Sequence, residues 1–123
     1  MKCIFCHLPE NTIVDGNDLA FAFYDKYPVT RLHTLIIPKR HVADYFELTQ
    51  EEIAAMHDLL QHQKARLLAL DETISGFNIG INVGADAGQT IFHVHMHLIP
   101  RRRGDMDDPK GGVRGVIPRK RKY

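Results

Sequence analysis

Apolar and polar residues alternate along several stretches of the chain, with the period of two that is typical of strands with one buried face. The alternation is regular over residues 77–83, and an apolar run covers residues 33–37. Closer to the N-terminus, two apolar stretches at 12–14 and 19–24 flank the Asp-Gly pair at 15–16, which favours a hairpin turn. These segments predict strands of an antiparallel sheet.

A helical period of three to four residues replaces the alternation in the middle of the chain. Its apolar positions form one stripe, which consists of Ile53, Met56, Leu60, Leu67 and Leu70. Thr49 and Glu52 have the spacing of a capping box, which predicts the start of the helix, and Gly76 marks the end of the region. Because one long helix stands between groups of strands, the order predicts an α+β domain with an antiparallel sheet of about five strands.

Residues 93–99 alternate again, but here the polar positions are three histidines, His93, His95 and His97. The pattern predicts a strand that ends at Pro100, with the even-numbered residues facing the core and the histidines on the opposite face. A polar outer face is a sufficient explanation for one histidine. Three histidines in register indicate a chemical role.

The composition is that of an ordinary globular chain, and 123 residues suffice for one domain with a core but not for two. The N-terminal residues lack the apolar run of a signal peptide, and the apolar run at 35–37 is far too short to span a bilayer. We therefore expect a cytoplasmic protein without membrane contact. In that compartment the C-x-x-C spacing of Cys3 and Cys6 indicates metal binding or redox chemistry and not a structural disulfide.

The charges are unevenly placed along the chain. Residues 1–100 hold 7 of the 16 basic and 12 of the 15 acidic side chains, which leaves 9 basic and 3 acidic ones in residues 101–123. We predict a domain over residues 1–105 and a basic C-terminal tail over residues 106–123. Such a tail either attracts phosphates or is a solvated chain end, and the second alternative is favoured, so nucleic acid is not an expected partner.

Two chemistries fit a row of histidines. A neutral imidazole is a nucleophile and a proton shuttle at neutral pH. Neighbours on one face of a strand lie roughly 6–7 Å apart, which suits a nucleophile beside a group that touches the leaving group. Coordination of one metal ion by all three histidines is the rival, but side chains on a regular strand do not converge readily on one ion.

The cysteine pair is either half of a zinc site or a redox pair. A redox pair is expected at the start of a helix, and Pro9 with the polar residues after it argues against one. Zinc requires two more ligands, for which His41 and one end of the histidine row are candidates. The glycine-rich segment at 84–89 could cradle a phosphate, although a plain loop would look the same.

The segment at 93–99 resembles the His-φ-His-φ-His-φ-φ signature (φ, apolar) of the histidine triad (HIT) superfamily of nucleotide hydrolases and transferases. Residues 3–6, 32–41 and 82–97 also fall in order at the family spacing. The resemblance implies an α+β, HIT-like fold, with the HIT domain in the N-terminal part and with an antiparallel sheet that continues across a homodimer.

For catalysis, the resemblance implies that His95 attacks the α-phosphorus of a nucleotide and forms a nucleotidyl-histidine, which water then hydrolyses. His97 and His33 match family histidines on the phosphate and leaving-group side, so the catalytic set is His95, His97 and His33. The carbonyl of His93 is expected to accept the Nδ1–H of His95, which leaves Nε2 of His95 free to attack.

For binding, the resemblance matches Asp25 to an acidic residue that holds ribose hydroxyls. The residues matched to the phosphate site are Asn82, Gln89, Thr90 and His97. Packing against the base is expected from apolar residues such as Phe5, Ile13 and Phe23. The resemblance also implies a structural Zn²⁺, and its ligands are matched to Cys3, Cys6, His41 and His93.

The implied function is a nucleotide hydrolase that cleaves a dinucleoside polyphosphate, such as diadenosine tetraphosphate, or a nucleoside phosphoramidate, and releases a purine nucleoside monophosphate. His97 favours hydrolysis, because the uridylyltransferase branch carries Gln at that position. The cysteine pair is similar to zinc-bearing, Hint-like bacterial members, whereas the Gly-Gln-Thr at 88–90 is similar to the Fhit-like branch.

The tail resembles the tails of bacterial members. We expect it near the dimer interface or the leaving-group end, where Arg114 or the final basic cluster could meet extra phosphates. The alternative function is a nucleotide-binding adaptor with vestigial catalysis, in which the basic tail recruits a partner or nucleic acid.

Overall fold

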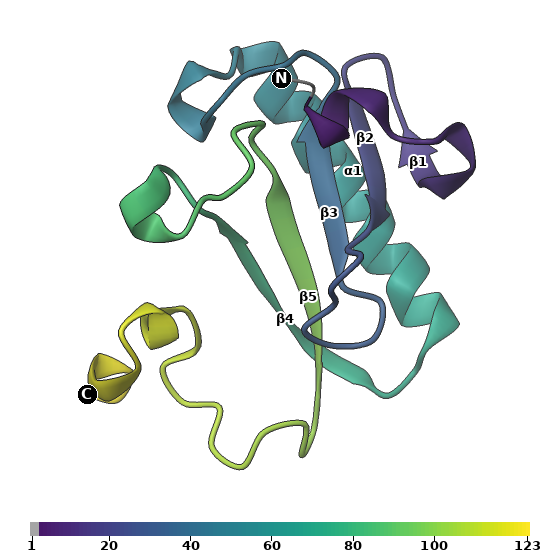
Figure 1. Cartoon of the computed structure of the whole chain (residues 1–123). Coiled ribbons are helices and arrows are strands. Elements are labelled where there is room, and N and C mark those ends of the chain that lie inside the picture. The colour runs from purple at the N-terminus through teal and green to yellow at the C-terminus, as the bar shows by residue number, and fades with distance from the viewer. Residues whose placement is uncertain (1–2) are drawn as a thin grey trace.

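The computed structural model describes residues 3–123, which form a five-stranded antiparallel sheet and one α-helix packed on it (Figure 1). The strands lie in the order β1-β2-β3-β5-β4. Their bounds are Ile13–Gly16 (β1), Ala20–Tyr24 (β2), Thr34–Pro38 (β3), Ile74–Ile81 (β4) and Met96–Arg102 (β5). The predicted α+β fold with five antiparallel strands and one helix is confirmed.

The helix, α1, spans Gln50–Leu70 and begins at the predicted capping box. The Glu52 amide donates to Thr49 Oγ1 (3.1 Å), and the Glu52 carboxylate accepts from the Thr49 amide (2.9 Å). We predicted that Gly76 marks the end of this region, and this prediction is wrong. The helix stops at Leu70, and Gly76 lies within β4. The Asp71 carboxylate accepts from the backbone amide of Thr73 (2.9 Å), which turns the chain toward the sheet.

The core lies between α1 and the middle of the sheet, where the helix crosses β2 and β3. Met56 and Leu59 of the helix pack on Ala20, Ala22 and Ile36, and each of these side chains is at most 1% exposed. The two alanines allow the helix to approach the sheet closely, because they leave little side chain between the two layers. This packing makes β3 and its neighbours a rigid base for the residues at their ends.

The predicted helical stripe is only partly buried. Met56 and Leu67 are in the core, whereas Leu70 is 55% exposed. Gln63 is fully buried although it is polar, because its Nε2 donates to the Asp15 carboxylate of β1 (3.1 Å). A hydrophobicity pattern cannot find such a position.

The N-terminal hairpin turns later than predicted. Asp15 and Gly16 are the last residues of β1, and the turn follows them. There the Asn17 side chain accepts from the amides of Leu19 (3.1 Å) and Ala20 (3.0 Å). An asparagine side chain therefore closes the turn that the Asp-Gly pair was expected to make.

The histidine-bearing strand is shorter at its start than the alternation predicted. β5 begins at Met96, so His93 and His95 precede the ladder. In this lead-in the Val94 amide donates to the carbonyl of Val42 (2.8 Å), which lies beyond the end of β3. The histidines therefore do not share one face of a regular strand, and each can point in its own direction.

Pro100 does not end β5, which continues to Arg102. Pairing between β3 and β5 reaches only to Thr34 opposite Leu98, so the chain beyond has a strand neighbour on the β4 side alone. The Pro100 carbonyl points to the other side, where Thr30 Oγ1 donates to it (2.6 Å). A proline is tolerated there because no ladder bond on that side needs its missing N–H.

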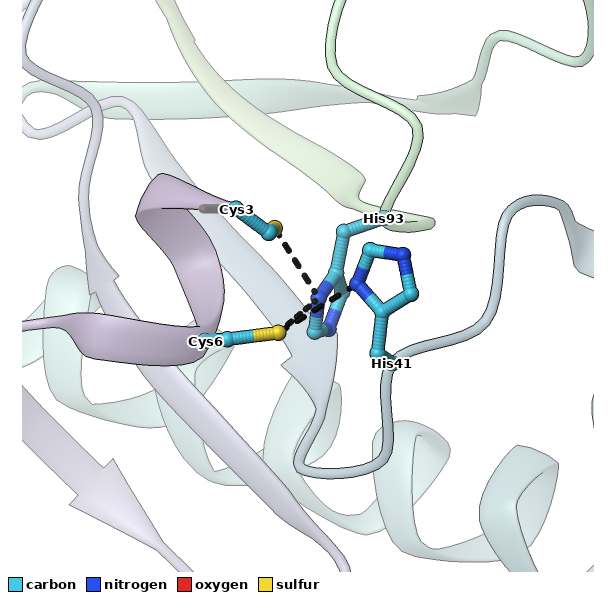
Figure 2. Close-up of side chains that lie close together, drawn as sticks. All are labelled: Cys3, Cys6, His41 and His93. Atoms are coloured by element: carbon cyan, nitrogen blue, oxygen red, sulfur yellow. Dashed lines mark hydrogen bonds between the residues drawn. The ribbon is translucent and has the colours of Figure 1, made fainter. Parts of the chain in front are cut away.

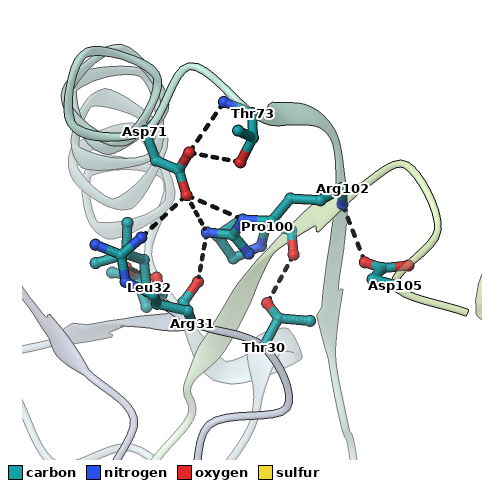
Figure 3. A network of polar contacts seen from close by, with 9 residues as sticks. Thr30, Arg31, Leu32, Asp71, Thr73, Pro100, Arg102 and Asp105 are labelled. Atoms are coloured by element: carbon teal, nitrogen blue, oxygen red, sulfur yellow. Dashed lines mark hydrogen bonds and ion pairs between the residues drawn. The ribbon is translucent and has the colours of Figure 1, made fainter.

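A polar network joins the β2–β3 loop to α1 and β5 (Figure 3). Asp71 accepts from Arg31 of the loop (3.1 Å) and from Arg102 of β5 (3.0 Å). Hydrogen bonds from Thr73, and the nearby Arg102, lower the pKa of Asp71 to about 2. Near the end of the loop, Leu32 has a positive φ of 74°. The network therefore fixes the loop that precedes His33.

The C-terminal tail folds back beside β4 and contains two 3₁₀ turns, η5 (Gly112–Val116) and η6 (Pro118–Lys120) (Figure 1). A Cβ at Gly111 would overlap the carbonyl of Arg121, so the fold of the tail requires glycine there. Within residues 3–123, no helix has the length and the apolar character that crossing a membrane demands.

Candidate functional site

Two groups of ligand-type side chains flank His95, which immediately precedes β5. One group consists of Cys3, Cys6, His41 and His93, and the other consists of Asp25, His33 and His97. In each group the side chains offer nitrogen, sulfur or oxygen atoms that lie within 4.8 Å of one another. The structure thus brings together all four predicted metal ligands, and it brings together the predicted catalytic residues around His95.

The first group surrounds the buried ring of His93 (Figure 2). His93 Nε2–H donates to the carbonyl of Pro38 at the end of β3 (2.8 Å), so Nδ1 carries the free lone pair. This Nδ1 lies 3.6 Å from Cys3 Sγ and 3.5 Å from Cys6 Sγ, and His41 Nδ1 lies 3.3 Å from Cys6 Sγ. The short 3₁₀ turn η1 (Ile4–His7) is what brings the two thiols to one side of the ring.

These four side chains fit a tetrahedral metal ion. Zinc bonds of about 2.3 Å to sulfur and about 2.0–2.1 Å to nitrogen, at tetrahedral angles, place nitrogen and sulfur ligands roughly 3.6 Å apart. The observed separations of 3.3–3.6 Å agree with that value. Desolvation, followed by the neighbouring Cys3 thiol, raises the pKa of Cys6.

His95 is oriented by the lead-in to β5. Its Nδ1–H donates to the carbonyl of His93 (2.9 Å), so Nε2 keeps an unshared lone pair. Phe5 packs edge-on against the ring, with the ring centroids 5.2 Å apart, and the ring centroid of His97 also lies 5.2 Å from that of His95. Because the backbone has left the β3 ladder at this point, the His93 carbonyl is available for this bond.

The second group is a chain of hydrogen bonds that starts at the backbone. The Val29 amide donates to His33 Nδ1 (3.0 Å), so neutral His33 carries its proton on Nε2. That Nε2 lies 2.9 Å from His97 Nδ1 and 3.5 Å from the Asp25 carboxylate. His97 Nδ1 accepts the hydrogen bond from His33 Nε2–H, so neutral His97 carries its own proton on Nε2.

His97 is held neutral by its surroundings. Burial, followed by the charges that His95 and His33 would carry, lowers its pKa to about 4. Burial also lowers the pKa of His33, against the opposite influence of Asp25. At neutral pH the His33–His97 pair therefore offers hydrogen bonds and not positive charge.

Two cavities meet at the site. One, of about 810 Å³, is lined mainly by apolar side chains, among them Phe5, Leu8 and Phe23. The other, of about 630 Å³, is lined by His33 and His97 together with β4, β5 and the tail. Asp25 and Tyr27 border both cavities. The ring of His95 packs on Phe5 of the first cavity and on His97 of the second.

The three residues predicted for the phosphate site have different positions. Asn82 lines the 630 Å³ cavity, and Thr90 is exposed. Gln89 is 3% exposed, and its amide is engaged by backbone groups: Nε2 donates to the carbonyls of Ala43 (2.6 Å) and Ile91 (3.1 Å), and Oε1 accepts from the Gly84 amide (2.9 Å). In this structure Gln89 therefore holds the loop ahead of His93.

Several groups that shape the site were not predicted from the sequence. The Val29 amide and the Pro38 carbonyl set the protonation of His33 and His93, and a backbone group leaves no sequence signal. Val113 and Val116 of the tail line the second cavity. In the sequence, only the three glycines at 111, 112 and 115 indicate that the backbone of the tail makes close contacts.

The comparisons with known proteins agree with this geometry. A profile of the HIT domain matches residues 8–104. An uncharacterised HIT-like protein of Mycoplasma genitalium is 41% identical over 104 residues, which are 81% of this chain and 73% of the relative. A zinc-bound histidine triad family protein from Mycobacterium smegmatis has a TM-score of 0.74 and 37% identity, covering 85% of this chain and 78% of that chain.

A diadenosine triphosphate hydrolase from Plasmodium falciparum, solved in complex with cyclomarin A, has a TM-score of 0.75 and 28% identity, and the match covers 82% of this chain and 68% of that chain. The fold and the histidine cluster place the chain in a superfamily of nucleotide-binding proteins and hydrolases. The chain belongs to the HIT family.

Proposed function

We propose that the protein hydrolyses a nucleotide derivative at its α-phosphorus, with His95 as the nucleophile, and releases a purine nucleoside monophosphate. One observation carries the proposal: the His93 carbonyl holds the Nδ1–H of His95, which leaves an unshared lone pair on Nε2. The uncharged His97 lies beside it as a hydrogen-bond donor for a phosphate oxygen. A nucleophile that needs no prior deprotonation suits attack on phosphorus at neutral pH.

The reaction has two displacements at phosphorus. In the first, the Nε2 lone pair of His95 forms a bond to the α-phosphorus, and the bond to the leaving group breaks. The leaving group keeps the electron pair and takes a proton from water. In the second, water attacks the same phosphorus, the P–N bond breaks and its pair returns to Nε2, while the surplus proton goes to solvent. The sum is the consumption of one water molecule.

The 810 Å³ cavity is the proposed site of the base. Its apolar wall includes Phe5 and Phe23, which pack edge to face with centroids 5.4 Å apart. Planar rings favour such aromatic surfaces. Asp25 borders the same cavity and is the proposed partner of the ribose hydroxyls.

The group of Cys3, Cys6, His41 and His93 is the proposed site of a structural Zn²⁺. When bound, the ion would supply cross-linking and no reactive position, because two thiolates and two imidazoles complete a tetrahedral shell. His93 then has two tasks in one residue. Its ring is a ligand, and its carbonyl orients His95.

We also propose a homodimer in which the sheet continues from one copy to the next. β4 is at the edge of the sheet, and its eight residues, ISGFNIGI, contain no charge and no proline. A long uncharged edge strand is a ready partner for another strand. Light scattering of the purified protein should give the mass of two chains, and the mass of one chain would remove this part of the proposal.

The hydrolase proposal is tested with an adenosine phosphoramidate and with diadenosine tetraphosphate as substrates. The natural protein should release AMP from at least one of them. His95→Asn should remove this activity, while His57→Asn, a matched change of an exposed histidine on α1, should leave it unchanged. Equal activity of the His95→Asn protein and the natural protein would contradict the proposal.

A further inference from the structure

The group of Cys3, Cys6, His41 and His93 has a buried side and a solvent side. The ring of His93 is 0% exposed, whereas Cys6 and His41 are exposed and Cys3 is half-buried. Buried structural cysteines are chemically inert, but a thiolate that meets water reacts with small oxidants. A soluble peroxide can therefore reach the Cys6 sulfur while the fold stays intact.

The backbone turn between the two cysteines holds their sulfur atoms close to each other. Cys3 directly precedes η1, and the Cys6 amide donates to the Cys3 carbonyl (3.1 Å). A turn closed in this way keeps its end Cα atoms within about 7 Å, and disulfides span roughly 4.4–6.8 Å between Cα atoms. The two Sγ atoms lie within 4.8 Å of each other (Figure 2). A disulfide therefore requires rotation of two side chains and little movement of the backbone.

The turn also has an anchor that does not involve sulfur. Phe5, which stands between the cysteines in the sequence, is 8% exposed and packs edge to face on Phe23. Burial of this ring stabilises the position of η1 whatever the oxidation state of the neighbouring sulfurs. His93 is held independently too, because its Nε2–H donates to the Pro38 carbonyl (2.8 Å). We therefore expect η1 and His93 to keep their places when the cysteines no longer bind a metal ion.

We propose that Cys3 and Cys6 are an oxidation site, at which a hydroperoxide joins the two sulfurs in a disulfide and a metal ion leaves a protein that stays folded. The proposal rests on the zinc site proposed above and adds a reversible chemical modification to it. The sulfurs of a disulfide carry no charge, so the group would retain only His41 and His93 as ligands. Two imidazoles do not complete the shell that a structural zinc ion requires. The pair is thus a target of oxidation and not a redox catalyst.

The oxidation has two steps. In the first, the Cys6 thiolate attacks one oxygen of hydrogen peroxide, an S–O bond forms, the O–O bond breaks, and hydroxide departs. In the second, the Cys3 thiolate attacks the Cys6 sulfur, an S–S bond forms, the S–O bond breaks, and a second hydroxide departs. Each hydroxide takes a proton from solvent. In sum, each sulfur gives up one electron, and the peroxide is reduced to two water molecules.

The test follows zinc and sulfur together in the protein purified with its zinc. Hydrogen peroxide is added in steps, released zinc is measured with a chromogenic chelator, and the intact mass is measured after denaturation and alkylation. We expect one zinc ion to be released for each chain that has lost the mass of two hydrogen atoms and resists alkylation. The far-UV circular dichroism should stay unchanged, and dithiothreitol with added zinc should restore the metal, because thiol exchange reopens a disulfide.

Cys3→His is the matched control for the second step. The variant keeps four metal ligands, since histidine also binds zinc, but it lacks the sulfur that closes the disulfide. Oxidation of its Cys6 gives a sulfenic acid, which dimedone traps, and three ligands remain. We expect its zinc loss to be at least about tenfold slower than that of the natural protein at the same peroxide concentration. Met106, which is 47% exposed, is an internal reference, because its sulfoxide should appear only at higher peroxide.

Four results would overturn the oxidation site. Zinc loss from Cys3→His at the natural rate would show that the disulfide has no part in the release. Oxygen atoms added to both cysteines, in place of lost hydrogens, would show irreversible damage. A disulfide between two chains would show that Cys3 and Cys6 are not each other's partners, and loss of the far-UV signal would contradict the anchoring of η1.

Failure of the oxidation site can be distinguished from failure of the zinc site, because the mass measurement requires no metal. A natural protein purified without zinc would contradict the metal assignment alone. A zinc-loaded protein that forms no disulfide with peroxide would contradict the oxidation site alone.

Discussion

The two groups of side chains on either side of His95 each contain a histidine with its proton on Nε2, but these two histidines present opposite ring nitrogens to their groups. In the cysteine-bearing group, the Pro38 carbonyl accepts from His93 Nε2, and Nδ1 is left as a lone pair that faces two thiols. In the other group, the Val29 amide donates to His33 Nδ1, and Nε2–H is left to face His97. A backbone acceptor makes one histidine a ligand, and a backbone donor makes the other a hydrogen-bond donor.

This difference teaches that the role of each histidine follows from the backbone group behind it. His95 has the other tautomer, because a carbonyl accepts from its Nδ1 and leaves Nε2 unprotonated, as a nucleophile requires. The distinction between the two groups would be wrong if substitutions in both groups had the same effects on bound zinc, stability and kcat. The predictions below run from the largest expected effect to the smallest.

The largest effect is expected from loss of the metal ligands. Cys6→Ser should lower bound zinc to well below one equivalent and lower the free energy of unfolding by about 3 kcal/mol or more, because metal binding contributes directly to folding. Elemental analysis and chemical denaturation measure the two quantities. His97→Asn is the control from the other group and should retain the metal. A natural protein purified without zinc, and with a stability unaffected by chelator, would contradict the assignment of this group.

The second effect is a loss of activity without loss of zinc, and it is expected from a substitution in the group of Asp25, His33 and His97. His33→Asn should lower kcat roughly ten- to a hundredfold while zinc stays bound, because the variant no longer fixes the proton of His97 on Nε2. Nitrogen-15 NMR of the imidazole rings reads the tautomer of His97 directly, and His62→Asn on the exposed face of α1 is the matched control. An unchanged His97 tautomer in His33→Asn would show that the hydrogen bonds from the Val29 amide through His33 do not fix the proton of His97.

The sequence alone predicted the members of both groups but not their arrangement. The sequence identified the histidine row and the candidates Cys3, Cys6 and His41 by their spacing, and it identified Asp25, His33 and the choice of His93 as a ligand only through the resemblance to the HIT superfamily. It could not predict that β5 begins only at Met96, because alternation continues through the lead-in, where the Val94 amide pairs with Val42 beyond β3. That departure from the ladder is what frees the His93 carbonyl for His95.

Other differences between the predictions and the structure also arise from contacts between residues that are distant in sequence. Pro100 was expected to end a strand, but it lies where β3 has already stopped pairing. From its charge alone the tail was expected to be a solvated end, whereas the resemblance to bacterial members suggested a position near the dimer interface or the leaving-group end. In the structure Arg121 and Lys122 bond within the tail, and the tail lines a cavity. Local patterns report propensity and burial, and they do not report which backbone groups lack a partner elsewhere in the fold.

A smaller effect is expected at Phe5, which lies next to His93 of the cysteine-bearing group and next to His95 itself. Its ring contacts His95 and lies 6.1 Å, centroid to centroid, from His93. Phe5→Leu keeps an apolar side chain but removes the aromatic wall of the 810 Å³ cavity, so we expect KM for an adenosine substrate to rise about tenfold with kcat little changed. Steady-state kinetics checks this split. A fall in kcat at constant KM would instead place Phe5 in the orientation of His95.

The smallest effect concerns pH. His97 has its pKa lowered from the usual 6.5 to about 4, so the unfolded chain takes up this proton before the folded protein does. The stability from a neutral His97 is complete above pH 6.5 and is lost as the pH falls toward 4. The His97 Cε1–H resonance should therefore titrate with a midpoint near 4. A midpoint near 6.5 would contradict the neutral His33–His97 pair.

The central claim is that His95 alone forms the covalent bond to phosphorus. Its most direct test is to mix the protein with a nucleoside phosphoramidate, quench within milliseconds in alkaline denaturant, which preserves a phosphorus–nitrogen bond, and locate the added group by tandem mass spectrometry. We predict one nucleoside monophosphoryl group, placed on His95, that is absent from His95→Asn. A nucleotidyl group on His93 or His97, or turnover in His95→Asn at the natural rate, would contradict the account.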